Sequence, residues 1–240
     1  MFVKRIVKRS FYFLGYDLAR LTAGSHSLVR RSLLFKTFDI SAVLDVGANV
    51  GQYAKQLRKL GFKGRILSFE PLSSAFRVLE RTAQDDELWE TYNHALGSAD
   101  THATINIAGN SYSSSLLEML PSHVQSAPDS TYIGQEQITI KSLDSIFWSL
   151  GLQSDNVYLK IDAQGYENEI LRGATSALEH IDTIQLELST RPLYIGGLLF
   201  DEMHKHLGEM KYSLIGIEPG FTDASTGELL QFDGIYHRYP

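Results

Sequence analysis

The chain has 240 residues, of which 43% are hydrophobic and 21% charged, and its formal net charge is −6. This composition excludes an intrinsically disordered chain, and a chain of this length buries enough surface for one full hydrophobic core. The sequence has no cysteine, which excludes disulfide scaffolds, iron–sulfur clusters, cysteine-ligated zinc and thiol nucleophiles.

The charge is distributed unevenly along the chain. Residues 1–36 contain eight Lys or Arg and one Asp, a charge of +7, whereas residues 37–240 contain 14 basic and 27 acidic side chains, a charge of −13. We expect residues 1–39 to form a basic helical appendage. The acidic remainder argues against nucleic acid as the main partner, because phosphate binding requires a basic face. The apolar stretch at 11–14 is too short for a signal peptide or a membrane span, so we expect a cytoplasmic protein.

From residue 42 onwards, short β-rich apolar runs alternate with helix-like segments, which is typical of an α/β fold with a mostly parallel sheet. The predicted crossover strands are 42–46, 65–69, 90–95, 157–161 and 183–188, and a closing hairpin is predicted at 212–217 and 231–236. The predicted helices are 52–60, 73–83, 166–180 and 197–210. We expect one domain over residues 40–240.

Residues 101–141 interrupt this alternation. Half-exposed strands are predicted at 103–107 and 137–141, followed by a helix at 142–150, and residues 110–130 contain seven serines and two prolines. A loop of this length inside a compact domain is usually functional or disordered. We interpret it either as a lid over a ligand or as a solvated surface loop.

The junction between the first strand and its helix reads D-V-G-A-N-V-G at 45–51. Glycines here let a ligand approach the backbone, and the helix N-terminus offers free N–H groups. The dinucleotide fingerprint would need glycines where the chain has Asn49 and Gln52. The segment instead resembles the acidic-x-Gly-x-x-x-Gly loop of class I methyltransferases, which bind S-adenosylmethionine.

Glu70 closes the second predicted strand, where a carboxylate can accept hydrogen bonds from both ribose hydroxyls of an adenosine ligand. NAD enzymes also place an acid here, so Glu70 does not distinguish the two ligands. The alternative interpretation is an ordinary tight turn followed by a solvated strand end.

Several longer motifs resemble the FkbM family of methyltransferases. They are V-L-D-V-G-A-N-V-G-Q-Y at 43–53, F-E-P at 69–71, N-H-A-L-G at 93–97, S-S-S-L at 113–116, L-D-S-I at 143–146, L-K-I-D-A-Q-G-Y-E at 159–167 and L-R-G-A at 171–174. The resemblance implies a Rossmann-like class I methyltransferase fold, in which a mostly parallel twisted sheet ends in an antiparallel hairpin and carries helices on both faces. It also implies S-adenosylmethionine as cofactor, contacted by Asp45, Gly47, Asn49, Gly51 and Glu70.

Asp162 and Glu187 lie at the carboxyl ends of consecutive crossover strands, which we expect to be adjacent and about 5 Å apart. Two carboxylates so placed could hold Mg²⁺ against a substrate hydroxyl, or one could act as a base. We therefore predict an acidic acceptor site with Glu167 nearby. Alternatively, Asp162 caps the following helix and Glu167 accepts bonds from its first-turn N–H groups.

Three further residues are candidates at the same edge of the sheet. His94 follows the third predicted strand and could accept a substrate proton or stack on adenine, although a structural role is equally compatible. Arg191 and Tyr194 follow the Glu187 strand and are placed to contact an acceptor, although Pro192 suits a plain loop.

The favoured function is an S-adenosylmethionine-dependent O-methyltransferase acting on a carbohydrate hydroxyl, often of a glycan, glycolipid or glycosylated metabolite according to the resemblance. The alternatives are an NAD-dependent sugar-nucleotide oxidoreductase, for which the loop lacks the glycines, and a non-catalytic S-adenosylmethionine-binding domain. Lys4, Arg5, Lys8 and Arg9 are interspersed with apolar side chains. This segment either rests as an amphipathic helix on the inner face of an anionic membrane or packs on the acidic body of its own chain or of a homodimer partner.

Overall fold

The computed structural model describes residues 9–16, 18 and 20–239, and the predicted basic residues Lys4, Arg5 and Lys8 lie outside them. The chain divides into two compact units, residues 1–39 and 40–240. In the first unit, residues 9–13 are helical and α2 spans Ser27–Thr37. Over the described residues, no helix combines the length and apolar character needed to cross a membrane.

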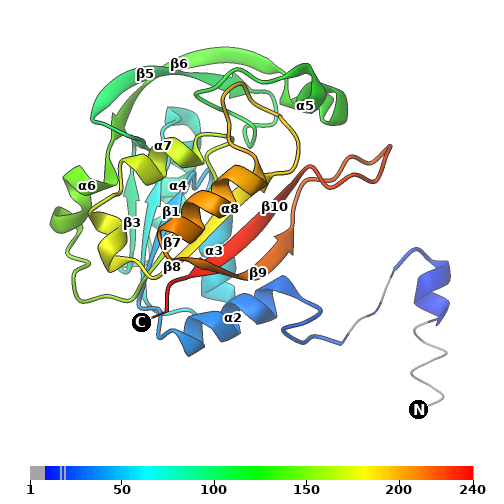
Figure 1. Cartoon of the computed structure of the whole chain (residues 1–240), viewed down its shortest axis with the longest axis horizontal. Helices are drawn as coiled ribbons and strands as arrows, with labels where there is room; N and C mark the ends of the chain where they lie inside the picture. The colour runs from blue at the N-terminus through cyan, green and yellow to red at the C-terminus, as the bar shows by residue number, and fades with distance from the viewer. Residues whose placement is uncertain (1–8, 17, 19, 240) are drawn as a thin grey trace. The chain divides into compact units, whose positions relative to one another are not determined.

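The second unit is built on a seven-stranded sheet of order β3-β2-β1-β7-β8-β10-β9 (Figure 1). The strands are β1 (Ala42–Val46), β2 (Arg65–Phe69), β3 (Trp89–Tyr92), β7 (Val157–Ile161), β8 (Thr183–Ser189), β9 (Ser213–Pro219) and β10 (Gln231–His237). β10 runs antiparallel to both of its neighbours, while β1, β2, β3, β7 and β8 are parallel to one another. The predicted parallel sheet with a C-terminal antiparallel hairpin is confirmed.

Helices cover both faces of this sheet, and alternation along each strand determines which side chains they meet. On one face, Leu44, Val46 and Ile161 pack in a core with residues of α6 (Leu143–Ile146), α7 (Glu167–Arg172) and α8 (Phe200–Glu209). On the other face lie α3 (Gln52–Lys59) and α4 (Ser73–Ala83), which bury Leu57 and Leu79.

A second sheet of order β4-β6-β5 interrupts the α/β alternation, and in Figure 1 its β5–β6 ribbon lies across one end of the main sheet. It consists of β4 (Ala95–Leu96), β5 (Thr101–Ala108) and β6 (Tyr132–Lys141), with α5 (Pro121–Ser126) and the 3₁₀ turn Pro128–Ser130 between β5 and β6. The predicted half-exposed strands are therefore present and longer than expected. The serine-rich segment contains a short helix.

The prediction of one strand at 90–95 is wrong, because the segment belongs to two sheets. β3 ends at Tyr92, opposite Phe69, the last residue of β2, and Pro71 has no N–H with which to extend the ladder. The chain then turns, and Ala95 pairs with Ile140 of β6.

The prediction of a single helix at 166–180 is also wrong. The helix ends at Gly173, where an added Cβ would lie 1.9 Å from the carbonyl oxygen of Gly97, and a separate 3₁₀ helix follows at Ala177–His180. The predicted helix at 142–150 likewise divides into α6 and the 3₁₀ helix Phe147–Leu150. The first of these helices thus ends where it meets the backbone of Gly97.

Candidate active site

The loop between β1 and α3 contains three residues in the left-handed region, Gly47 (φ 76°), Asn49 (φ 49°) and Gly51 (φ 85°). A Cβ on Gly47 would lie 1.8 Å from the carbonyl oxygen of Asp162, and a Cβ on Gly51 would lie 2.9 Å from the ring of Trp89. The protein's own packing therefore requires both glycines. The first of them brings the end of β1 into backbone contact with the end of β7.

The N–H groups of this loop are hydrogen-bonded within the protein. Five successive amides each have an acceptor within the chain: Gly47 and Ala48 donate to Phe69 O (3.0 Å each), Asn49 to Glu70 Oε2 (2.8 Å), Val50 to Asn49 Oδ1 (2.9 Å) and Gly51 to Ala48 O (2.9 Å). A pyrophosphate needs such amides free to donate to it. The loop is thus held in place by the protein and does not fit the phosphate cradle of a dinucleotide site.

Glu70 is the carboxylate that fixes this loop. It is buried, and besides the bond from Asn49 its Oε1 accepts from the N–H of Leu72 (2.8 Å). Burial raises the pKa of Glu70 to about 7, against the lowering effect of these two bonds. Each carboxylate oxygen has a second lone pair, so the side chain can still accept from a ribose hydroxyl. This side chain therefore fits an adenosine ligand, and contact with the cofactor stays a prediction.

Lys160 of β7 is a site residue that the sequence analysis missed. It lies opposite Asp45 in the sheet register, both side chains are buried, and its Nζ is 3.5 Å from Asp45 Oδ1 and 3.4 Å from Asp162 Oδ2. Its Nζ also lies over the ring of Tyr53, 5.3 Å from the centroid. A lysine within the apolar run V-Y-L-K-I was the available signal, because a buried lysine requires a charged partner.

Opposing effects determine the charge states of this group. Burial raises the pKa of Asp45, and the Lys160 charge and the Ser68 hydroxyl, 3.2 Å from Asp45 Oδ2, oppose that rise. Burial alone would lower the pKa of Lys160, but the charges of Asp162 and Asp45 outweigh it and raise this pKa above its usual range. Lys160 is therefore a buried cation between the carboxylate of Asp45 in β1 and that of Asp162 after β7.

The predicted carboxylates Asp162 and Glu187 do lie together, since β7 and β8 are adjacent and a glutamine joins the two side chains. The Nε2 of Gln164 donates to Asp162 Oδ1 and to Glu187 Oε2, at 2.9 Å each. The hydroxyl of Tyr194 donates to Gln164 Oε1 (2.7 Å), and the Nε2 of Gln231 donates to Glu187 Oε2 (2.7 Å). The sequence analysis missed both glutamines, because neither belongs to an acid or base motif.

The two carboxylates differ in environment. Burial and the charges of Asp162 and Glu167 raise the pKa of Glu187 well above its usual range. The side chain of Asp162 is 37% exposed and lies beside the Lys160 ammonium. Asp162 is therefore the solvent-accessible carboxyl of the pair, and Glu187 is the buried one.

The side chains around Asp162 and Glu187 do not fit the predicted magnesium site. Within the part of the chain that the structure describes, no group of three or more His, Asp or Glu side chains is placed to hold a metal ion. Between Asp162 and Glu187 lies the amide NH₂ of Gln164, a hydrogen-bond donor, whereas Mg²⁺ requires oxygen acceptors.

Glu167 is buried and engaged with the backbone. Its Oε1 accepts from the N–H groups of Ala163 (3.0 Å) and Gly165 (3.2 Å), and burial raises its pKa to about 7. These bonds fix the turn that carries Gln164. They correspond to the structural alternative raised from sequence, with the bonds going to the turn before α7.

The remaining predicted residues lie in three different settings. His94 donates from Nδ1 to Ala95 O (3.1 Å), and its ring centroid lies 5.4 Å from that of Phe69. Burial lowers the pKa of His94, which leaves its Nε2 as an acceptor at neutral pH. Tyr194 is buried against Gln164, and burial raises its pKa above its usual range. Arg191 forms an exposed ion pair with Glu228 (2.9 Å).

The serine-rich segment contacts both halves of the site. The Nδ2 of Asn49 donates to the carbonyl and the hydroxyl oxygen of Ser111 (3.3 Å each), and the hydroxyl of Ser115 donates to Gln164 O (2.7 Å). Ser113 and Ser115 are buried. Part of this segment is thus packed against the loop at 47–51, the donor loop, and against the acidic cluster of Asp162, Gln164 and Glu187.

Comparisons with known proteins agree with this geometry. The family model of the methyltransferase FkbM domain matches residues 45–214. "Methyltransferase 1" of Beauveria bassiana (strain ARSEF 2860) is 26% identical over 165 residues, which cover 62% of this chain and 65% of that protein. The chain thus matches just under two thirds of that relative's length.

Two solved structures share the fold. The methyltransferase domain of bacterial CtHen1-C has a TM-score of 0.50 at 9% identity, covering 91% of this chain and 100% of that chain. A candidate O-methyltransferase from Klebsiella pneumoniae has a TM-score of 0.50 at 13% identity, covering 98% of this chain and 89% of that chain. The family match favours methyl transfer over the NAD alternative. The chain therefore belongs to the FkbM methyltransferase domain family and has the class I methyltransferase fold.

Proposed function

We propose that the protein transfers a methyl group from S-adenosylmethionine to a hydroxyl oxygen of a carbohydrate. The observation that carries this proposal is the environment of Asp162, an accessible carboxylate that lies 3.4 Å from a buried lysine and whose backbone lies against Gly47 of the loop after β1. An alcohol is a poor nucleophile, and a carboxylate within reach of its proton assists its attack.

The donor half of the site has groups that fit S-adenosylmethionine. The carboxylate of Glu70 is suited to the ribose hydroxyls, and the loop at 47–51, whose amides are already bonded within the chain, is suited to a nucleoside without a pyrophosphate. When bound, S-adenosylmethionine supplies a methyl group on a positively charged sulfur. Asp45 adds buried negative charge at this end of β1.

On the acceptor half, Asp162 accepts the hydroxyl proton as the oxygen–methyl bond forms. Lys160 lies beside Asp162 Oδ2, and Gln164 fixes the orientation of this carboxylate through the bond to Oδ1. Tyr194 in turn fixes the amide of Gln164. Methyl transfer by in-line displacement depends mainly on positioning, which this chain of bonds provides. The serine-rich segment, held to Asn49 and Gln164, acts as the lid that excludes water.

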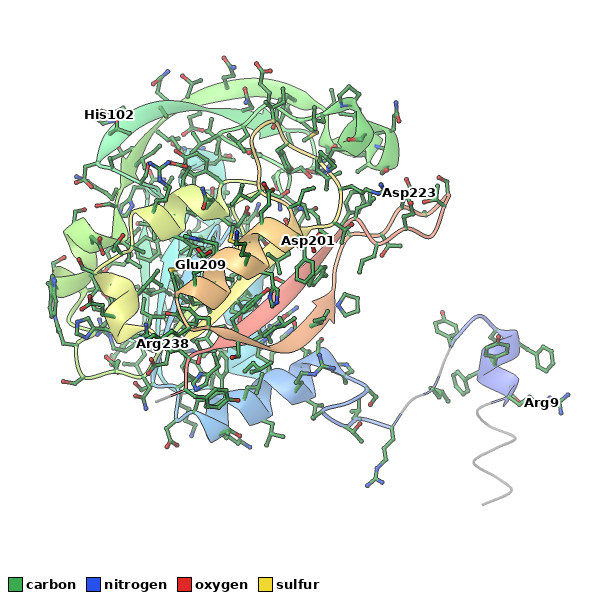
Figure 2. All side chains as sticks on the ribbon, viewed as in Figure 1. Arg9, His102, Asp201, Glu209, Asp223 and Arg238 are labelled. Carbon is green, nitrogen blue, oxygen red and sulfur yellow. The ribbon has the colours of Figure 1, made fainter. Side chains whose placement is uncertain are left out.

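The lining of one surface groove supports a carbohydrate acceptor. It has a volume of about 560 Å³ and is lined by α5, the segment after β8 and the β9–β10 connection, where Figure 2 shows Asp223. Its polar lining includes Gln125, Arg191 and Asp223 and its apolar lining includes Pro192 and Leu193. A pyranose ring presents hydroxyls at its edge and C–H groups on its faces, so it matches both kinds of lining. One of its lining residues, Leu193, precedes Tyr194 in the sequence.

The test is methyl transfer from labelled S-adenosylmethionine to a panel of monosaccharides, oligosaccharides and glycolipids. We expect an alkali-stable ether methyl group on the product. Asp162→Asn should lower the transfer rate by about 10²- to 10⁴-fold, with S-adenosylhomocysteine affinity, measured by calorimetry, changed little. Asp201→Asn, an exposed substitution on α8, is the matched control and should change neither quantity.

Each other outcome contradicts a different part of the proposal. An unchanged rate in Asp162→Asn would remove the base. Product only on nitrogen or carboxylate acceptors would refute the carbohydrate class. Failure to bind S-adenosylhomocysteine would refute the cofactor, and binding without transfer to any acceptor would favour the non-catalytic domain.

A further inference from the structure

The N-terminal unit carries a dense group of exposed apolar side chains. Among the described residues, 17 large hydrophobic side chains are exposed, and seven of them fall within residues 11–21. These seven, which we call the apolar segment, are Phe11, Tyr12, Phe13, Leu14, Tyr16, Leu18 and Leu21, exposed by 41 to 77%. Single exposed hydrophobic residues are normal, but a contiguous group marks a surface that binds something.

The chemistry of the segment combines aromatic rings with cations. Residues 9–13 are helical, and the guanidinium of Arg9 lies over the ring of Phe13, 5.9 Å from its centroid (Figure 2 shows Arg9). In the sequence, Lys4, Arg5 and Lys8 precede this turn and Arg20 follows it. Phe, Tyr and Leu beside Lys and Arg are the composition of segments that lie at a membrane–water interface.

Charge distinguishes a lipid surface from the other candidate partners. Residues 1–36 carry +7 and residues 37–240 carry −13, so an anionic surface attracts the segment and repels the rest of the chain. A lipid surface offers both anionic headgroups for the cations and an apolar interior for the seven apolar side chains. Two copies of the segment would repel each other at the same charge.

We propose that the apolar segment is an interfacial anchor that binds the headgroup region of an anionic lipid surface. Phe11, Phe13 and their neighbours enter the interface, and the flanking Lys and Arg side chains contact the anionic headgroups. The inference is independent of the acceptor proposed above.

The test is co-sedimentation of the full-length chain with vesicles. One set contains equal parts of phosphatidylcholine and phosphatidylglycerol, and the other contains phosphatidylcholine alone. We expect binding to the first set, weakened by added salt. Lys8→Gln/Arg9→Gln should lower the partition coefficient about thirtyfold, because each cation near an anionic surface contributes roughly fivefold. Phe11→Ser/Phe13→Ser should lower it more than about tenfold on the same vesicles.

Matched controls come from the second unit, where Lys55→Gln/Lys59→Gln and Ile133→Ser/Trp148→Ser remove exposed charges and exposed apolar side chains, respectively. Neither control should change vesicle binding. A chain that stays in the supernatant with both vesicle sets would overturn the proposal, as would segment variants that bind as well as the controls. A dimer in light scattering that is lost in Phe11→Ser/Phe13→Ser would overturn it in favour of a second copy of the chain.

Discussion

Replacing Lys160 with Met tests the charged group at the centre of the sheet. The substitution keeps most of the length of the side chain and removes its charge, so the Asp45 carboxylate, which is fully buried, is left with the Ser68 hydroxyl as its remaining polar support. At 3.5 Å the lost attraction amounts to about 5 kcal/mol for an effective dielectric constant of about 20. Removing one partner of a buried pair costs about 3 to 5 kcal/mol in measured cases, and we expect a loss of that size.

The assay is urea unfolding of the wild type, Lys160→Met and Asp45→Asn/Lys160→Met. The double variant should recover much of the lost free energy of unfolding, since it removes the uncompensated charge. Lowering the pH should reduce the difference in free energy of unfolding between the wild type and Lys160→Met, because the raised pKa of Asp45 lets this carboxyl bind a proton in the folded state. Lys141→Met breaks an exposed ion pair with Asp100 and should cost less than about 1 kcal/mol.

Two results would refute the reasoning. One is a free energy of unfolding of Lys160→Met within about 1 kcal/mol of the wild type, which lies below the expected range. The other is a deficit that neither Asp45→Asn nor lower pH relieves.

Three further substitutions test other contacts. Burial raises the pKa of Glu167 to about 7, so its stabilising effect is full below pH 4.5 and is lost as pH rises through 7. Glu167→Gln keeps the bonds to Oε1, and its free energy of unfolding in urea should rise by roughly 3 kcal/mol relative to the wild type between pH 4.5 and 8. A rise equal to that of the exposed control Glu179→Gln would contradict this. Gly47→Ala places a Cβ 1.8 Å from Asp162 O and should lower the free energy of unfolding, measured by thermal unfolding, by about 2 to 5 kcal/mol. Gly61→Ala has a similar φ and open space around the added Cβ, so it should cost about 1 to 2 kcal/mol. Equal losses would rule out the backbone contact as the cause. Tyr194→Phe frees the amide of Gln164 and should slow methyl transfer about tenfold at unchanged S-adenosylhomocysteine affinity. A rate equal to that of the control Tyr212→Phe would show that the Tyr194 hydroxyl does not position Gln164 for the reaction.

Local periodicity predicted the main sheet well. The strands 42–46 and 65–69 and the helix 73–83 match the structure residue for residue, because each is an apolar run or an amphipathic stretch with a clear turn at its end. The breaks at 93–94 and at Gly173 were missed, because they depend on contacts with β6 and with Gly97, which are distant in sequence.

The candidate site was predicted in part for the same reason. Strand ends identified Asp162 and Glu187, and the order of parallel strands brought them together. Lys160 was missed because its two partners come from sheet register and from the turn after β7. The amide bridge of Gln164 was missed because a residue with φ of 54° in a turn has no periodic signal.

The close approach of Gly47 to the Asp162 carbonyl places the loop at 47–51 and the proposed base in one contiguous backbone unit. The groove, in contrast, is lined by α5, the segment after β8 and the β9–β10 connection, which lie outside that unit. Under the proposed function, substitution, insertion or deletion in those connections would change acceptor preference without moving the proposed base relative to the loop at 47–51. For protein engineering, the proposal singles out residues 120–126 and 191–193 for altering acceptor choice, and residues 45–51 and 160–164 for leaving unchanged.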